Sequence, residues 1–372
     1  MFWRNFITLL RRYTASSLLN IVGMAIAFAA VYLIAVQVKF DLSYNHVIKN
    51  SERIYRLEHP HWFDEEGVWD CSWNRQWPDE VSALCPEIEA AGSFHITPYS
   101  SQREYSVKRN SAIENYTIEI ATAEPEGLAV FPFEFVAGSL ADYNTTDDMI
   151  ISESTAKRCN LKVGDRLHYG RGAESSQMRT IVAIFKDFPQ PSSIARTEGW
   201  FCMPAQDDTS ADNWGDPYYI RLREGSSPEE VEKRMNDYII EDARKRGLSE
   251  EDIKTNVERT TVRLTPIGEL YFTTDSPPEA LQGSRITTYT IIAIAVLILV
   301  ISFINFVNFF FALIPSRIRA VNNYKIFGAP TAKLRLNFLF ETVGLILVSL
   351  FGAAVIVVLF ADTPLKEYIS TS

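Results

Sequence analysis

Three long stretches without a charged residue constrain this chain more than any other feature. They cover residues 18–36, 286–316 and 342–361 of a 372-residue sequence. Each provides roughly the 20 apolar residues that a helix needs to cross a ~30 Å hydrocarbon core. A helix buried in a soluble protein rarely stays uncharged on every face for so long. The sequence therefore predicts three transmembrane helices. We place these helices at 18–38, 286–314 and 336–361.

The first stretch has a second interpretation, because a cleaved signal peptide is also apolar. Ala25, Ile26 and Ala27 offer small residues at a spacing typical of a cleavage site. The apolar residues nevertheless continue to Val36, which is too long for a typical signal peptide. We expect an uncleaved anchor.

Basic residues predict the orientation. Two segments carry arginine or lysine and no acidic residue: Arg4, Arg11 and Arg12 before the first stretch, and Arg317, Arg319, Lys325, Lys333 and Arg335 between the second and third. Short loops rich in Lys and Arg stay in the cytoplasm. We therefore expect a cytoplasmic N-terminus and residues 39–285 on the opposite side. The formal net charge of −10 argues against nucleic acid as a partner, since like charges repel.

The two ends of the chain lie outside the predicted spans. In residues 1–17, aromatic and aliphatic side chains share one helical face and Arg4, Arg11 and Arg12 the other. This pattern is typical of a short helix at the cytoplasmic surface of the lipid bilayer, although its apolar face could also pack on the protein's own helices. Residues 362–372 should form a short periplasmic tail.

The middle region, 39–285, mixes strand and helix patterns. Alternating or short apolar segments predict strands at 53–58, 113–122, 148–151, 166–169, 180–185 and 260–264. Helices are predicted at 76–91, 152–159 and 228–245, with Pro86 as a residue that could break the first of them. The last has a strong start, because Ser227 can cap it and Pro228 occupies its first position. Interspersed strands and helices predict an α+β extracytoplasmic domain inserted between transmembrane α-helices.

No motif predicts catalysis or a cofactor. The nucleotide-binding pattern G-x-x-x-x-G-K-[ST] is absent, as are H-E-x-x-H, C-x-x-C and G-x-S-x-G. His59 and His61, which precede Asp64, Glu65 and Glu66, could bind a divalent metal, but a polar loop is the simpler interpretation. We expect no enzyme, no cofactor and no metal.

All four cysteines lie in the region predicted to be exported. An oxidising compartment would allow up to two disulfides, and buried thiols are the alternative. Cys71 and Cys85 are the preferred pair because the intervening loop is short, and Cys159 and Cys202 remain.

Polar residues inside the predicted spans suggest packing between helices. Asn305 and Asn308 lie three residues apart in the second span, and Glu341 lies about one turn into the third. Such groups usually face protein or water, not lipid. Glu341 could instead extend toward the cytoplasmic headgroups.

The segment between the second and third spans, 315–335, predicts a short basic helix that ends at Gly328. Ile318, Val321, Tyr324 and Lys325 share one face of it. A plain interfacial helix would also explain this composition.

This segment resembles the FtsX/MacB-like family of ABC-transporter permeases. The matching residues are Arg317, Val321, Lys325, Phe327, Gly328, Ala329, Phe338, Leu339 and Glu341. Residues 43–57 and 147–158 are similar to the corresponding segments of Bacteroidetes members, and the order of segments also matches.

The resemblance implies a MacB-like periplasmic core domain and a cytoplasmic coupling helix that docks on a separate ABC ATPase. The coupling residues would be Arg317, Arg319, Val321, Tyr324, Lys325, Gly328 and Ala329. The chain would be the permease subunit of an export or mechanotransmission complex in the bacterial inner membrane. It would pair as a homo- or heterodimer within the lipid bilayer, and a periplasmic protein could be a further partner.

Two departures keep other interpretations open. The coupling segment carries Ala320 and Asn322 where the family has an acidic residue and a glycine. The family also usually has at least one more span, so we expect the chain to correspond to an N-terminal unit. A non-transporting scaffold or sensor that binds a periplasmic protein, and an uncoupled permease remnant, are the alternatives.

Overall fold

A computed structural model shows that the chain forms two compact units. One consists of Met1–Leu42 and Ser284–Ser372, and the other of Ser43–Gly283. We call them the helical unit and the α+β unit. The structure describes residues 14–61, 67–96, 100–109, 112–170, 177–204, 206, 213–254, 261–278, 281–326 and 330–360.

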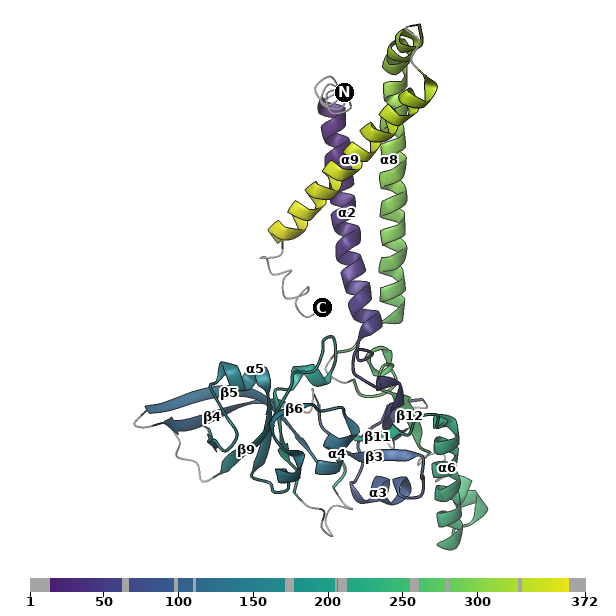
Figure 1. Ribbon diagram of the computed structural model, residues 1–372. Coiled ribbons are helices and arrows are strands. Elements are labelled where there is room, and N and C mark those ends of the chain that lie inside the picture. Colours follow the sequence, from purple (N-terminus) through teal and green to yellow (C-terminus); the bar gives the residue numbers. More distant parts are fainter. Residues whose placement is uncertain are drawn as a thin grey trace. The chain divides into compact units, whose positions relative to one another are not determined.

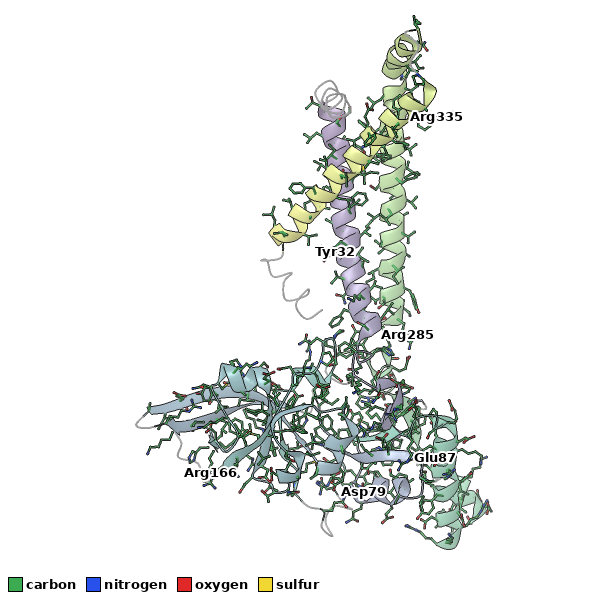
Figure 2. All side chains as sticks on the ribbon, viewed as in Figure 1. Tyr32, Asp79, Glu87, Arg166, Arg285 and Arg335 are labelled. Carbon is green, nitrogen blue, oxygen red and sulfur yellow. The ribbon has the colours of Figure 1, made fainter. Side chains whose placement is uncertain are left out.

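The described part of the helical unit consists of three long helices (Figure 1). They are α2 (Thr14–Ser43), α8 (Arg285–Ile326) and α9 (Thr331–Phe360). Each contains a segment long and apolar enough to cross a membrane: Thr14–Ser43, Arg285–Pro315 and Phe338–Leu359. Figure 2 shows Arg285 and Arg335 at opposite ends of this unit. The predicted surface helix at 1–17 and tail at 362–372 fall largely or wholly outside the described residues.

Close helix packing holds the helical unit together. Phe309 and Leu313 of α8 and Leu345 of α9 form a small buried cluster, against which Ile21 of α2 packs. A Cβ atom added to Gly352 would lie 3.1 Å from Cβ of Ala25, so α9 approaches α2 closely at this point. Small residues permit such approaches between helices in lipid.

The α+β unit contains two sheets. In the first, the strand order is β12-β1-β11-β3, and β2 also pairs with β1. The strands are β1 (Ile54–Pro60), β2 (Trp69–Asp70), β3 (Ile88–Ser93), β11 (Tyr218–Leu222) and β12 (Arg263–Pro266). The helices α3 (Gln76–Ser82) and α6 (Pro228–Lys245) pack on this sheet, because Val81, Val231 and Met235 share a buried cluster with Leu57 and Leu222.

The second sheet closes into a ring. Its order is β6-β9-β7-β10-β5-β4-β8, and β8 also pairs with β9, so six of its strands form a closed circuit. The strands are β4 (Ser101–Arg109), β5 (Ala112–Ala123), β6 (Phe135–Gly138), β7 (Asp148–Ser152), β8 (Arg166–Tyr169), β9 (Met178–Phe185) and β10 (Gly199–Cys202). Ile118, Met149, Leu167 and Ile181 belong to one buried cluster, together with Ala156 of α5 (Glu153–Arg158). Closure leaves no free sheet edge in the ring.

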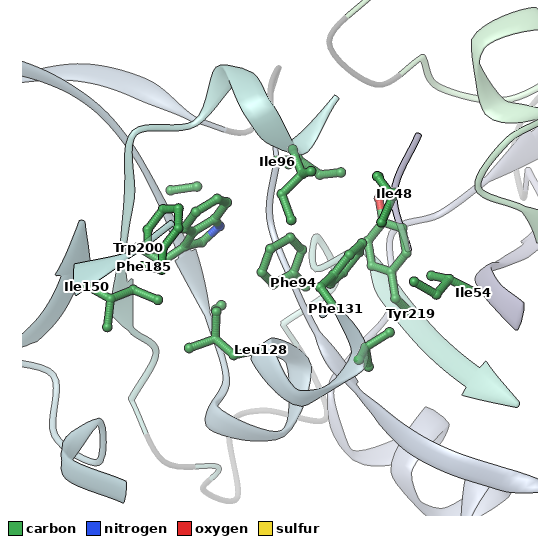
Figure 3. Packing of buried hydrophobic residues seen from close by; sticks show 14 of the residues in the cluster. Ile48, Ile54, Phe94, Ile96, Leu128, Phe131, Ile150, Phe185, Trp200 and Tyr219 are labelled. Carbon is green, nitrogen blue, oxygen red and sulfur yellow. The ribbon is translucent and has the colours of Figure 1, made fainter. Parts of the chain in front are cut away.

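An aromatic core joins the two sheets into one unit (Figure 3). Phe94 stacks on Trp200 with ring centroids 5.2 Å apart, and Phe131 and Tyr219 extend the same cluster toward the first sheet. The indole Nε1 of Trp200 donates a 2.7 Å hydrogen bond to the carbonyl oxygen of His95. The short helix α4 (Pro125–Val130) contributes Leu128 and Val130 to this core.

Most of the predicted strands and helices of this region are confirmed. Residues 113–122 lie in β5, 152–159 surround α5, 166–169 form β8, and 180–185 lie in β9. The start of α6 is also confirmed, since Oγ of Ser227 accepts a hydrogen bond from the backbone N–H of Glu230. The predicted strand at 260–264 lies instead at β12, three residues later at its start.

The helix predicted at 76–91 is too long. The observed helix α3 ends at Ser82, and β3 begins at Ile88. Pro86 explains the difference, because a proline lacks the backbone N–H of a continuing helix and disfavours a helical conformation in the preceding residue.

Candidate functional site

The segment predicted to couple to an ATPase is not a separate helix. The helix α8 continues through Pro315 to Ile326, so residues 316–326 extend it by about 16 Å beyond its apolar part. Ile318 and Asn322 are exposed, and Val321 is half-buried. Arg317, Arg319, Tyr324 and Lys325 lie on the same helical stretch. Gly328 and Ala329 lie outside the described residues.

An apolar groove of about 620 Å³ runs beside this extension. It is lined by α8 residues from Phe303 to Asn322 and by Phe338 and Thr342 of α9. Val321 is therefore at one end of a groove that continues into the apolar part of the helical pair.

The polar residues predicted to pack within the spans have different surroundings. Asn305 faces α2, because its Nδ2 lies 3.7 Å from the position of a Cβ atom added to Gly23. Asn308 is exposed on α8, and one carboxylate oxygen of Glu341 is buried. Asn305 is thus near α2 but, like Asn308, it is exposed.

A hydrogen-bonded cluster connects the end of α2 to the start of α8. These are the two helix ends that flank the α+β unit in the sequence. The Thr288 hydroxyl donates a 2.6 Å bond to the buried carboxylate of Asp41, and Gln37 donates a 2.8 Å bond to its other oxygen. This cluster therefore joins the last turns of α2 to the first turn of α8.

The chain enters the α+β unit at a firmly held residue. Asn45 is fully buried with a positive φ of 61°. Its amide donates to the carbonyl oxygen of Ile267 at 3.0 Å and accepts from the backbone N–H of Ser193 at 2.7 Å. Only one residue separates Asn45 from the end of α2 in the sequence.

A cavity of about 840 Å³ lies between the two sheets of the α+β unit. Its walls come from α3, β3, the start of α4, the end of β10 and β11. Glu124 is the most buried acid on this wall: it accepts a 2.8 Å hydrogen bond from the backbone N–H of Ser93 and lies 3.3 Å from Nε of Arg75. Burial raises the pKa of Glu124 to about 7, although the Ser93 amide and the Arg75 guanidinium oppose the shift.

Family models account for most of the chain. The MacB-like periplasmic core domain matches residues 17–238, well over half of the sequence, and the FtsX-like permease C-terminal region matches residues 292–368. The chain belongs to the FtsX/MacB-like family of ABC-transporter permeases. Members of this family are permease components of ABC transporters.

Solved structures similar to this permease are also permease or transporter domains. A domain of a permease protein from Porphyromonas gingivalis is 22% identical in sequence and superposes with a TM-score of 0.45. The match covers 66% of this chain and 99% of the Porphyromonas gingivalis domain. The extracellular domain of the ABC-type transporter YknZ from Gram-positive bacteria is 10% identical with a TM-score of 0.35, covering 57% and 99%. The periplasmic region of MacB from Actinobacillus actinomycetemcomitans is 8% identical with a TM-score of 0.35, covering 59% and 91%. No curated protein matches the permease.

The disulfide prediction is wrong. Cys71, Cys85, Cys159 and Cys202 of the permease are all buried thiols outside any disulfide. Cys85 belongs to the apolar cluster that packs on the first sheet. Burial raises the pKa of the Cys202 thiol to about 11, so this thiol stays protonated and unreactive at neutral pH.

His59 of the permease is a structural residue. Its two ring nitrogens lie 2.8 Å from the carbonyl oxygen of Pro60 and 3.1 Å from that of Ser72, and its ring contacts Trp73. His61 lies 3.9 Å from the Asp70 carboxylate. The acidic residues at 64–66 lie outside the described residues.

Two polar residues of α2, Ser17 and Asn20, were not predicted from the sequence to have a role. Both are buried, and among the described residues their side-chain oxygens and the Asn20 amide nitrogen make no hydrogen bond. Asn20 is a polar residue inside the first uncharged stretch, and a polar residue in an apolar span was the available signal.

The Glu124 environment predicts a pH-dependent stability. The folded pKa of about 7 exceeds the ordinary value of 4.5, so the folded permease holds an extra proton between these values. Its free energy of unfolding should therefore fall as the pH rises from 4.5 to 7, by about 3 kcal/mol at most. We expect Glu124→Gln to change stability little at pH 5 and to raise it at pH 8. Denaturant unfolding at both pH values tests this, and an equal effect at both would contradict it.

Proposed function

We propose that this permease is the transmembrane subunit of an ABC-type export or mechanotransmission complex. It would couple ATP hydrolysis by a separate ATPase to movement of its periplasmic domain. The continuity of α8 carries the proposal, because a single 42-residue helix joins the basic coupling segment to the first residues after the α+β unit. A continuous helix transmits displacement along its axis, whereas a helix broken at Pro315 would absorb it.

The two ends of α8 suit this role. At one end, Ile318 and Val321 offer apolar contacts and Arg317, Arg319 and Lys325 supply positive charge. Such a helix can bind a groove through its apolar face while the charged residues form the rim. At the other end, the Asp41–Thr288 hydrogen bond links α2 to α8, so a displacement of α8 would also move α2.

Co-purification tests the proposal. The permease, expressed with the ABC ATPase of the same cell and extracted in mild detergent, should retain that ATPase through size exclusion. Its presence should also change the ATPase's hydrolysis rate. Failure of any ATPase to co-elute, with the permease intact, would favour the scaffold or remnant interpretation.

We also propose the orientation in the inner membrane: an N-terminus and residues 315–335 in the cytoplasm, and the α+β unit in the periplasm. Dimerisation through lipid-exposed positions such as Asn308 would agree with its exposure on α8. A periplasmic protein partner remains compatible with this arrangement.

Cysteine labelling tests the orientation. Glu224 and Asn322 are both exposed, so Glu224→Cys and Asn322→Cys place accessible thiols on the two sides of the proposed membrane. We expect a membrane-impermeant maleimide to label position 224 in intact cells and position 322 only after permeabilisation. The unsubstituted protein is the control, because its four buried cysteines should label weakly. The reverse pattern would refute the orientation.

A further inference from the structure

The cavity between the two sheets of the α+β unit has an excess of negative charge on its wall. Four carboxylates line it, from Asp79, Glu89, Glu124 and Glu126, against one arginine, Arg223. Its volume of about 840 Å³ is within the range of pockets that hold small organic ligands.

Ion pairs within the protein compensate only two of these acids. Glu89 is paired with Arg53 at 3.1 Å and with Arg221 at 3.0 Å, and Glu124 is paired with Arg75. The Arg223 guanidinium donates a 2.9 Å hydrogen bond to the carbonyl oxygen of Pro86. The cavity therefore retains the negative charges of Asp79 and Glu126 against the single positive charge of Arg223, which a neutral carbonyl oxygen does not cancel.

Neutral donors hold the Asp79 carboxylate in place. The Tyr218 hydroxyl donates to one of its oxygens and the Gln206 amide donates a 2.5 Å hydrogen bond to the other. Two uncharged donors orient a carboxylate without neutralising it. Asp79 lies on α3 in Figure 2.

The buried hydroxyl of Ser82, on the same wall, also makes no hydrogen bond of good geometry. Ser82 is 7% exposed, and its Oγ makes no hydrogen bond of good geometry within the described part of the chain, although the Tyr218 hydroxyl lies near enough to interact with it. Buried polar atoms are nearly always satisfied, so such an atom in a cavity wall indicates a missing partner.

The rest of the wall is apolar or weakly polar. Ile88, Ala90, Ala91, Cys202 and Met203 contribute apolar surface, and Asn144 and three prolines also line the cavity. A ligand that fits must therefore combine a positive charge with an apolar body.

We propose that this cavity binds a small organic ammonium compound, with its charged nitrogen against Asp79 and Glu126 and its apolar part against β3 and the end of β10. A cation in a partly enclosed cavity gains more from a carboxylate than it would in water, because the surroundings screen the attraction less. The site does not depend on ATPase coupling.

Ionisation of Glu124 adds a pH dependence to the binding. The groups that face this acid are Arg75, Asp79, Gln206, Tyr218 and the Ser93 backbone N–H. A bound ammonium favours the ionised carboxylate, so tyramine, which keeps its positive charge over this range, should bind more tightly at pH 8 than at pH 5.

Titration calorimetry on the full chain in lipid nanodiscs tests the site with three probes that share one ring: tyramine, the neutral alcohol tyrosol and the anion 4-hydroxyphenylacetate. We expect saturable binding of tyramine at least tenfold tighter than that of tyrosol, and none of the anion. Equal binding of tyramine and tyrosol, or no saturable tyramine binding, would overturn the proposal.

A pair of matched variants separates the site from general attraction to an acidic protein. Asp79→Asn with Glu126→Gln removes two charges from the cavity, whereas Asp237→Asn with Glu241→Gln removes two exposed charges from α6. The first should weaken tyramine binding at least tenfold and the second should leave it unchanged. Ala83→Trp, which adds bulk at an exposed position of the wall, should also weaken binding while both acids remain. Equal losses in the two double variants would overturn the proposal, as would unchanged binding in Ala83→Trp.

Discussion

Replacing Glu58 by alanine should lower the free energy of unfolding of the α+β unit by about 3–5 kcal/mol. Glu58 is fully buried on β1. Its carboxylate accepts hydrogen bonds from Arg56 at 2.5 Å, Arg263 at 2.8 Å, Thr265 at 2.6 Å and Ser276 at 2.9 Å. Truncation would leave the Arg56 guanidinium, which is also buried, without its carboxylate partner. Thermal and denaturant unfolding followed by tryptophan fluorescence would measure the loss.

Two further measurements separate this network from ordinary surface charge. Glu241→Gln removes an exposed partner of Lys245 on α6 and should cost at most about 0.5 kcal/mol. Burial raises the pKa of Glu58, but Arg56, Thr265 and Arg263 outweigh it and leave that pKa below the ordinary 4.5. The stabilisation is thus fully present above pH 4.5 and is lost as the pH falls through the folded pKa. A Glu58→Ala variant as stable as Glu241→Gln would contradict the role of the network.

Substituting both Val321 and Tyr324 with aspartate should abolish association with the ATPase. The two positions share one face of the α8 extension, and an unpaired charge buried in a protein groove costs several kcal/mol. Since 1.4 kcal/mol is a tenfold change in affinity, we expect a loss of at least about 100-fold. Retention of the ATPase during purification, normalised to the amount of permease, is the measurement.

Neighbouring positions provide the matched control. Asn322→Asp with Asn323→Asp adds the same two charges at neighbouring positions outside the predicted face of Ile318, Val321 and Tyr324, and should retain most of the association. Ala320→Glu restores the family's acidic residue and should not weaken it. If the Val321 and Tyr324 double variant co-purifies at the normal yield, residues 316–326 are not the coupling segment.

The amino-acid sequence alone predicted the features that depend on local pattern. Uncharged stretches of about 20 residues indicated the three long helices, because lipid cannot solvate charge or unpaired backbone. Ser227 and Pro228 predicted the start of α6, and alternation over 113–122 predicted β5. The motif around Gly328 indicated the family, which the family models confirm.

The tertiary structure decided everything that depends on residues far apart in the chain. In the sequence of β1, Arg56 and Glu58 alternate with apolar residues, which is the pattern of a strand with one solvent-exposed face. Both are nevertheless buried, because β11 and β12 flank β1 and Ser276 completes the network. Likewise, only pairing across the chain closes β8 onto β4 and β9, keeps Cys71 apart from Cys85, and assembles the cavity around Glu124 from both sheets. Burial and proximity of this kind arise from long-range packing, which leaves no fixed spacing in the sequence.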